Sequence, residues 1–123
     1  MDFHNLLENL KNQSFFSNLI IERGIEKESL RVTKNGYISN KKHPETLGSS
    51  YTNPSITTDF AESLIEIVTP TYTNVDELYE KLKIIHIFIN QNLKDGEMLW
   101  PFSMPPKIED ETKINIATYG KTN

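Results

Sequence analysis

The chain has 123 residues, enough for one small domain with its own hydrophobic core. A formal net charge of −4 without a basic stretch argues against a nucleic-acid partner, and the absence of cysteine excludes disulfides and thiolate metal sites. No secretory signal opens the sequence and no apolar run reaches the ~18 residues of a membrane span, so we expect a cytoplasmic protein without a membrane partner.

The first predicted element is a helix from about Phe3 to Lys11, with Asp2 as its cap. Its apolar side chains recur at helical spacing, which is typical of a helix that docks one face against other structure. These residues are Phe3, Leu6, Leu7 and Leu10.

A predicted strand from Arg23 to Thr33 carries two carboxylates on one face. Side chains alternate along a strand, so Glu26 and Glu28 share a face with Leu30 and Val32. A face turned to the core should be apolar, so the acids lie either where the strand leaves the core or in a polar cavity. This conflict between pattern and chemistry marks the strand as a candidate functional site.

A hairpin turn is predicted next, because Asn35-Gly36 separates two strand-like runs and suits a turn with two positive φ angles. Residues Tyr37–Ser39 form the short returning strand, and residues 40–54 are rich enough in polar and turn residues to predict a loop.

The second informative stretch, Ile56–Thr69, has β-branched residues at both ends and is predicted to be one strand. Asp59 and Glu66 are seven positions apart, which places them on opposite faces of a regular strand. They can share a site only if a bulge shifts the register, so we predict an irregularity between Ala61 and Ser63.

The clearest predicted helix begins after the cap Asn74 and ends near Leu93. Met98–Pro106 contains three prolines, which exclude a regular helix or a central strand and predict an extended segment. The predicted buried stripe of the helix is Val75, Leu78, Leu82, Ile85 and Ile89, widened by Tyr79 and Leu93.

Four acids stand beside apolar residues in strand-like stretches. Two acidic residues at positions i and i+2 of a strand have Cβ atoms about 6–7 Å apart, near enough for their carboxylate oxygens to converge on one cation. Hard oxygen ligands without a cysteine or a histidine cluster favour Mg²⁺ or Mn²⁺ over zinc. The candidate metal ligands are Glu26, Glu28, Asp59 and Glu66.

An alternative interpretation needs no metal. The acids then line an exposed sheet face and pair with Arg23, Lys27 or Arg31. The sequence has no glycine-rich phosphate loop, so a bound nucleotide would be held through metal.

Five stretches in register carry a family resemblance. They are Arg23–Val32, His43–Ser49, Ile56–Glu66, Met98–Pro105 and Tyr119–Gly120. Together they resemble the N-terminal signature of proteobacterial glutamate–cysteine ligase, and the resemblance extends over about Ile20 to Asn123.

The resemblance implies an α+β fold, part of a glutamine-synthetase-like, mostly antiparallel sheet with flanking helices. It implies ATP-dependent ligation of the γ-carboxylate of L-glutamate to L-cysteine through a γ-glutamyl phosphate, the first step of glutathione biosynthesis. The implied small-molecule partners are glutamate, cysteine and ATP, with Mg²⁺ or Mn²⁺ as the metal. The four acids match the family's metal ligands, and Phe60 matches a position beside the substrate pocket.

Members of that family are several hundred residues long. We therefore expect residues 1–123 to be a single partial domain, an N-terminal fragment that is inactive without the C-terminal part of the same polypeptide. The alternative is a non-catalytic binding or regulatory module that reuses the family's N-terminal region.

Overall fold

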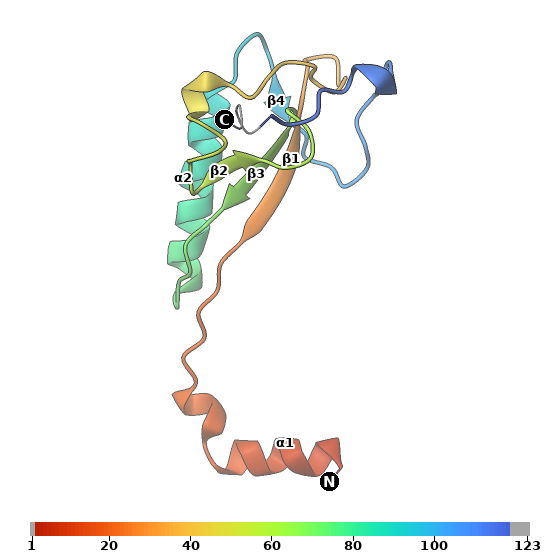
Figure 1. Ribbon diagram of the computed structural model, residues 1–123. Coiled ribbons are helices and arrows are strands. Elements are labelled where there is room, and N and C mark those ends of the chain that lie inside the picture. The colour runs from red at the N-terminus through yellow and green to blue at the C-terminus, as the bar shows by residue number, and fades with distance from the viewer. Residues whose placement is uncertain (1, 119–123) are drawn as a thin grey trace, which may run out of the picture.

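The computed structural model describes residues 2–118, which form a four-stranded sheet, a helix packed beside it and a second helix in a separate N-terminal arm (Figure 1). The helices and strands are α1 Phe3–Asn12, β1 Glu26–Val32, β2 Ile56–Thr58, β3 Leu64–Val68, α2 Val75–Asn92 and β4 Met98–Leu99. Short 3₁₀ turns lie at Phe15–Asn18, Glu45–Leu47 and Glu111–Lys113.

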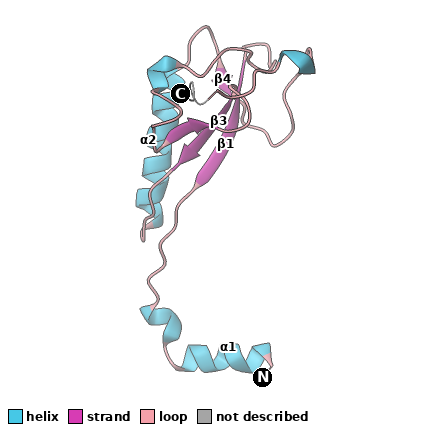
Figure 2. Ribbon diagram, in the orientation of Figure 1, coloured by secondary structure: helices cyan, strands magenta, loops and turns pink. Residues whose placement is uncertain are grey.

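All strand pairs of the sheet are antiparallel, in the order β2-β3-β1-β4. Helix α2 runs along one face of this sheet (Figure 2). The hydrophobic core lies between them and combines Leu47, Ile56, Ile65, Ile67, Ile85 and Ile89. The expected α+β class with a mostly antiparallel sheet is therefore confirmed.

Strand β1 and helix α2 form where the sequence predicts them. The Asn74 side chain caps α2 by accepting a hydrogen bond from the Asp76 N–H at 2.8 Å. The predicted stripe is confirmed for Leu78, Ile85 and Ile89, which are buried, and for Leu82 and Leu93, which pack against the core. It is wrong for Val75 and Tyr79, which lie on the exposed surface.

The predicted single strand Ile56–Thr69 is wrong, because this stretch folds into a hairpin. Strand β2 ends at Thr58, the chain turns through residues 59–63, and β3 returns antiparallel to β2. The predicted irregularity between Ala61 and Ser63 exists, but it is the reversal between two strands and not a bulge. The Leu64 N–H closes the turn on the Ala61 carbonyl at 2.9 Å.

The hairpin turn after β1 is confirmed with a different geometry. Its closing hydrogen bond runs from the Gly36 N–H to the Thr33 carbonyl at 2.9 Å, and Val32 pairs with Ile38 beyond it. Gly36 has φ +79°, whereas Asn35 does not adopt a positive φ. One left-handed residue at the end of the turn, Gly36, replaces the two that we expected, and glycine takes this conformation without strain.

The N-terminal arm, residues 3–21, lies apart from the sheet. Helix α1 is present as predicted, but the Asp2 side chain makes no capping hydrogen bond and no α1 residue is buried. Figure 1 shows α1 at the end of an extended segment, away from the sheet and α2. Among the described residues, no helix combines the length and apolar character that crossing a membrane requires.

Candidate metal-binding site

Glu28 and Glu66 face each other across the two central strands. The antiparallel register of β1 and β3 pairs Glu28 directly with Glu66, and it pairs Glu26 with Val68. Directly opposed side chains have Cβ atoms about 4.5–5.5 Å apart and lie on the same face of the sheet. Glu26 is two positions from Glu28 and shares that face.

Asp59 reaches the same face because of the hairpin. Thr57 is paired with Glu66, and Asp59 follows Thr57 by two positions, so it lies on the side of Glu66. The backbone N–H of Asp59 approaches the Leu64 carbonyl at 3.4 Å, which continues the pairing by one step. The reversal of the chain thus places Asp59 on the same face as Glu66, which the expected bulge would also have done.

Electrostatic repulsion links Glu66 to the other three acids. Burial raises the pKa of the Glu66 carboxyl, and the negative charges of Asp59, Glu26 and Glu28 raise it further. A carboxylate repelled by three neighbours gains most from a nearby cation.

The alternative without metal is confirmed in part, because Glu26 and Glu28 lie on an exposed sheet face. The three cations named for it have other partners. Arg31 lies on the opposite face of β1 and forms its ion pair with Glu97 at 2.9 Å. The Lys27 amine donates to the Ser29 hydroxyl on that same opposite face. Arg23 donates to the carbonyls of Ile21 and Thr73, at 3.3 and 3.4 Å.

The donor set fits a hard divalent cation. Four carboxylates on one sheet face provide the oxygen ligands that Mg²⁺ and Mn²⁺ prefer. In residues 2–118 as they stand, no three acidic or histidine side chains converge closely enough to hold an ion. The strand register places the four acids on one face, and their side chains as described do not by themselves form a metal site.

A hollow of about 390 Å³ opens beside Glu28 on the acid face. Part of its wall is formed by Met104 and by the rings of Trp100 and Phe102, which meet edge to face with 5.1 Å between their centroids. Phe60, next to Asp59 in the turn, is 69% exposed and free to contact a bound molecule. Small-molecule sites are usually hollows lined mainly by apolar side chains, with a few charged or polar groups beside them.

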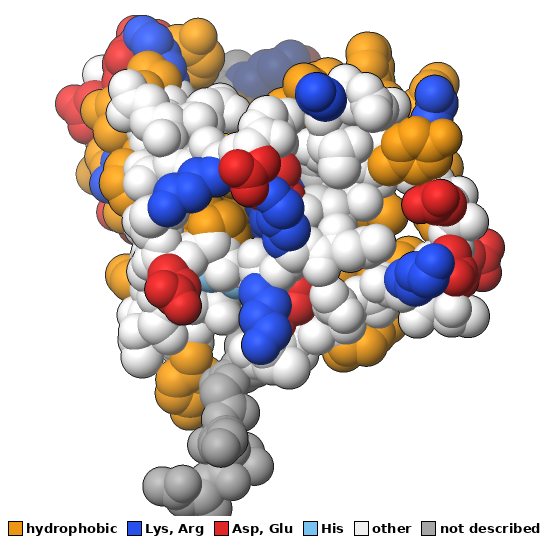
Figure 3. Space-filling model, turned by 90° about the horizontal axis from the view of Figure 1, so that it is seen from above, with side chains coloured by type: hydrophobic (Ala, Val, Ile, Leu, Met, Phe, Trp, Pro, Cys, Tyr) orange, Lys and Arg blue, Asp and Glu red, His pale blue; other side chains and the backbone are white. Residues whose placement is uncertain are grey.

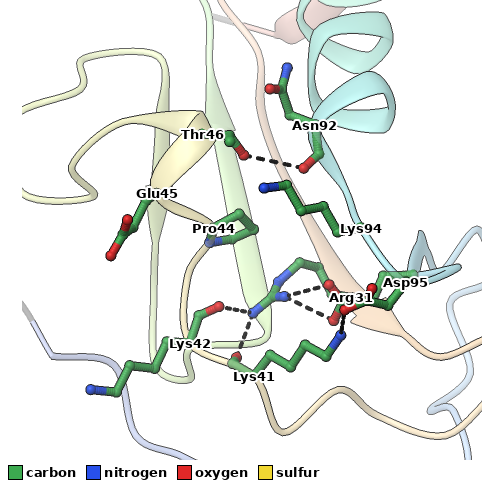
Figure 4. Close-up of a pocket in the computed structure, with 10 residues that line it drawn as sticks. Arg31, Lys41, Lys42, Pro44, Glu45, Thr46, Asn92, Lys94 and Asp95 are labelled. Carbon is green, nitrogen blue, oxygen red and sulfur yellow. Dashed lines mark hydrogen bonds and ion pairs between the residues drawn. The ribbon is translucent and has the colours of Figure 1, made fainter.

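A second hollow, of about 300 Å³, lies beside Arg31 (Figure 4). Four of the charged residues in its lining form two ion pairs, Arg31 with Glu97 and Lys41 with Asp95. Figure 3, viewed from above, likewise shows acidic and basic side chains interspersed on this end of the molecule. We therefore place the candidate site on the acid face.

Two residues have roles in the geometry that the sequence does not predict, since Arg31 was expected only as a partner of the four acids. Arg31 is completely buried, and its guanidinium donates to the carbonyls of Lys41, Lys42 and Glu62 as well as to Glu97. Glu62 is a buried acid in the turn that carries Asp59. The sequence signal for Arg31 was its alternation with Ser29 on the face opposite the acids; nothing local distinguishes Glu62.

The sequence matches known proteins over nearly its whole length. The family model described as glutamate–cysteine ligase matches residues 5–123. The glutamate–cysteine ligases of Hahella chejuensis and of Buchnera aphidicola subsp. Acyrthosiphon pisum are each 50% identical over 103 residues. These matches cover 84% of this chain and 20% of each relative, so the chain spans about a fifth of their length.

Solved structures agree with the sequence matches. The glutamate–cysteine ligase of Francisella tularensis, in complex with AMP, aligns with a TM-score of 0.77 and 36% identity over 80% of this chain and 20% of that one. A bifunctional glutathione synthetase from Pasteurella multocida aligns with a TM-score of 0.78 and 35% identity over 93% of this chain and 15% of that one. Fold, sequence and the order of the motifs agree, and the chain belongs to the glutamate–cysteine ligase family.

Proposed function

We propose that this chain forms the carboxylate wall of the ATP- and metal-binding site of a cytoplasmic glutamate–cysteine ligase. The observation that carries the proposal is the shared face of Glu28 and Glu66, directly opposed in the register, with Glu26 and Asp59 close enough to raise the Glu66 pKa. The AMP bound to the Francisella relative supports a nucleotide site in this fold.

The four acids would hold Mg²⁺, with Mn²⁺ as the alternative ion. When bound, Mg²⁺ supplies positive charge that offsets the charge on phosphate oxygens. The protein's own contribution is to fix the carboxylates on a rigid sheet, so that their repulsion is already present before ligands arrive. Phe60 and the hollow beside Glu28 would contact the small-molecule substrates.

The reaction that this site would serve joins L-glutamate to L-cysteine at the expense of ATP. The γ-carboxylate of glutamate takes the γ-phosphoryl group of ATP and releases ADP, which gives a γ-glutamyl phosphate. The amine of cysteine then attacks the acyl carbon, inorganic phosphate leaves with the bonding pair, and the amine loses a proton. Phosphoryl transfer of this kind depends mainly on positioning and charge stabilisation.

The same proposal assigns residues 1–123 to one partial domain that needs the C-terminal part of a longer ligase polypeptide for activity. The relatives extend well beyond the matched fifth. Large apolar side chains remain exposed along the N-terminal arm and on α2, including Phe3, Ile20, Ile84 and Phe88. Exposed apolar surface of this extent is typical of a face that other structure covers.

Complementation between two polypeptides tests the proposal. This chain would be mixed with the Hahella relative from which the matched N-terminal segment has been removed, and ATP-dependent γ-glutamylcysteine formation measured. We expect no product from either polypeptide alone and product from the mixture. Glu66→Gln should abolish that activity, whereas Glu109→Gln, the same change at an exposed acid, should retain it.

Product from the isolated chain would overturn the need for a C-terminal part. A mixture that forms a stable complex by size-exclusion chromatography but gives no product would overturn the ligase assignment of this segment.

A further inference from the structure

The turn between β2 and β3 contains a buried acid that is not among the four candidate metal ligands. Glu62 is only 5% exposed. Its Oε1 accepts hydrogen bonds from the N–H and the hydroxyl of Thr118, at 3.0 and 2.6 Å, and its Oε2 accepts one from the His43 N–H at 2.7 Å. One carboxylate therefore joins three segments that are far apart in the sequence.

The backbone of the turn is fixed at the same point. The Glu62 N–H donates to the Asn115 carbonyl at 2.9 Å, and the Glu62 carbonyl accepts from Arg31 Nη2 at 2.9 Å. The preceding residue, Ala61, forms a bridge with Ile116. The turn is thus held both by the buried Arg31 of β1 and by residues 115–118.

These long-range contacts compensate for weak local turn chemistry. Turn-forming side chains stand only at the ends of the turn, Asp59 and Ser63, and the three residues between them include no glycine, proline or asparagine. The backbone hydrogen bond from the Asp59 N–H to the Leu64 carbonyl is long, with 3.4 Å between nitrogen and oxygen. The conformation that carries Asp59 toward Glu66 therefore depends on contacts from outside the turn.

We propose that Glu62 is a positioning residue that sets the place of Asp59 beside Glu66 by holding the turn against residues 115–118 and His43. The consequence for metal affinity rests on the proposed function; the clamp itself does not. Outer partners of metal ligands commonly contribute about 10–100-fold to metal affinity, although they never touch the ion.

An ionised carboxylate suits this position better than an amide. Both oxygens of Glu62 accept hydrogen bonds, whereas an amide would turn a donor toward one of the three donor groups. Burial raises the pKa of the Glu62 carboxyl, but hydrogen bonds from Thr118 and His43 outweigh it and the net shift is downward. Glu62 is accordingly ionised at neutral pH.

The chain offers a matched pair of variants for the test. Thr118→Val removes a hydroxyl that lies 2.6 Å from the Glu62 carboxylate. Thr112→Val removes a hydroxyl at the same distance from the Asp110 carboxylate, and in both places the residue's own N–H bonds the same oxygen at 3.0 Å. Thr112 lies outside the turn and outside the acid face, so it serves as the control.

Two readouts are measured on the whole chain and on both variants, with Glu62→Gln as the stronger change if it folds. Mn²⁺ affinity is measured by electron paramagnetic resonance with Mn²⁺ alone. Amide hydrogen exchange is measured at Leu64 and Ala117, whose N–H groups bond to the turn, and in α2 for comparison.

We expect Thr118→Val to weaken Mn²⁺ binding about 10-fold and to speed exchange at Leu64 and Ala117 but not in α2. Thr112→Val should change neither readout. Uniformly faster exchange would indicate only a loss of global stability and would overturn the proposal.

Unchanged exchange at the turn would overturn the clamp, and faster exchange with unchanged Mn²⁺ affinity would overturn the positioning role. If the unmodified chain binds no Mn²⁺, the proposed metal site fails, and the exchange data alone then decide whether Glu62 holds the turn.

Discussion

Acidic and basic side chains have different surroundings on the two faces of strand β1. Glu66 lies close enough to Asp59, Glu26 and Glu28 for their negative charges to raise its pKa, a cost that a bound ion would remove. Arg31, in contrast, is buried with a full set of carboxylate and carbonyl partners, and only its Nε lacks one among the described residues. The acid face carries the candidate chemistry, and the Arg31 side holds the strand in place.

Removing the charge of Glu66 should stabilise the metal-free chain. Like charges directly opposed on a sheet cost about 0.2–1 kcal/mol, so Glu66→Gln should raise the free energy of unfolding by that amount at neutral pH. The folded-state pKa of Glu66 lies above the unfolded value, so the repulsion is present above the raised pKa and vanishes below the ordinary glutamate pKa.

Urea denaturation at neutral and acidic pH measures this effect. Glu109→Gln, at an exposed acid outside the cluster, should leave the free energy of unfolding nearly unchanged at both pH values. A stabilisation by Glu66→Gln that persists in acid would show that charge repulsion is not its cause.

Arg31→Met should lower the free energy of unfolding by about 3–5 kcal/mol, because it leaves the Glu97 carboxylate buried without its partner. Burial lowers the pKa of the Arg31 guanidinium, and the Glu97 carboxylate opposes that shift. Arg31→Met combined with Glu97→Gln should therefore cost less than the sum of the single changes. A double-mutant cycle by denaturation checks this, and strict additivity would contradict it.

At the scale of elements, the sequence predicts what local patterns determine. Strand β1, helix α2 and the turn at Gly36 have clear periodicity, capping or turn residues, and all three are present. The hairpin between β2 and β3 was missed because the three central positions of its turn, Phe60, Ala61 and Glu62, carry no turn-forming residue. The turn is held instead by Thr118 and Arg31, which are remote in the sequence. The acids could be selected from their pattern, but their common face required the register.

The cap of α2 gives a test at this scale. Asn74→Ala removes the acceptor of the Asp76 N–H and should lower the free energy of unfolding by about 0.5–2 kcal/mol. Asn74→Asp keeps an acceptor and should remain close to the unmodified chain. An equal loss in both variants, measured by thermal or urea denaturation, would contradict the assigned capping role.

The whole molecule leaves apolar surface uncovered on elements that are well formed. Ile84, Ile87 and Phe88 share one exposed stripe of α2, at spacings of three and four residues, while the opposite stripe fills the core. The N-terminal arm adds Phe15 and Ile20 to the exposed apolar set. This distribution agrees with a chain that spans about a fifth of its curated relatives.

The isolated chain should therefore self-associate at high concentration. Ile84→Lys with Phe88→Glu should reduce the association measured by sedimentation velocity, and surface changes of this kind usually alter the free energy of unfolding by less than about 0.5 kcal/mol. Tyr51→Lys, at an exposed apolar residue outside this stripe, serves as the control and should leave association unchanged. A chain that stays monomeric at every concentration would contradict the expectation.

The central claim is that the acid face of β1 and β3 binds a divalent cation with a nucleotide, and calorimetric titration of the chain with Mg²⁺–ATP tests it most directly. We predict binding by the unmodified chain, a loss of at least about 10-fold in Glu26→Gln/Glu28→Gln, and no loss in Glu109→Gln/Glu111→Gln, the same change at two exposed acids. Equal binding by all three, or no binding by a chain that unfolds cooperatively, would contradict the claim.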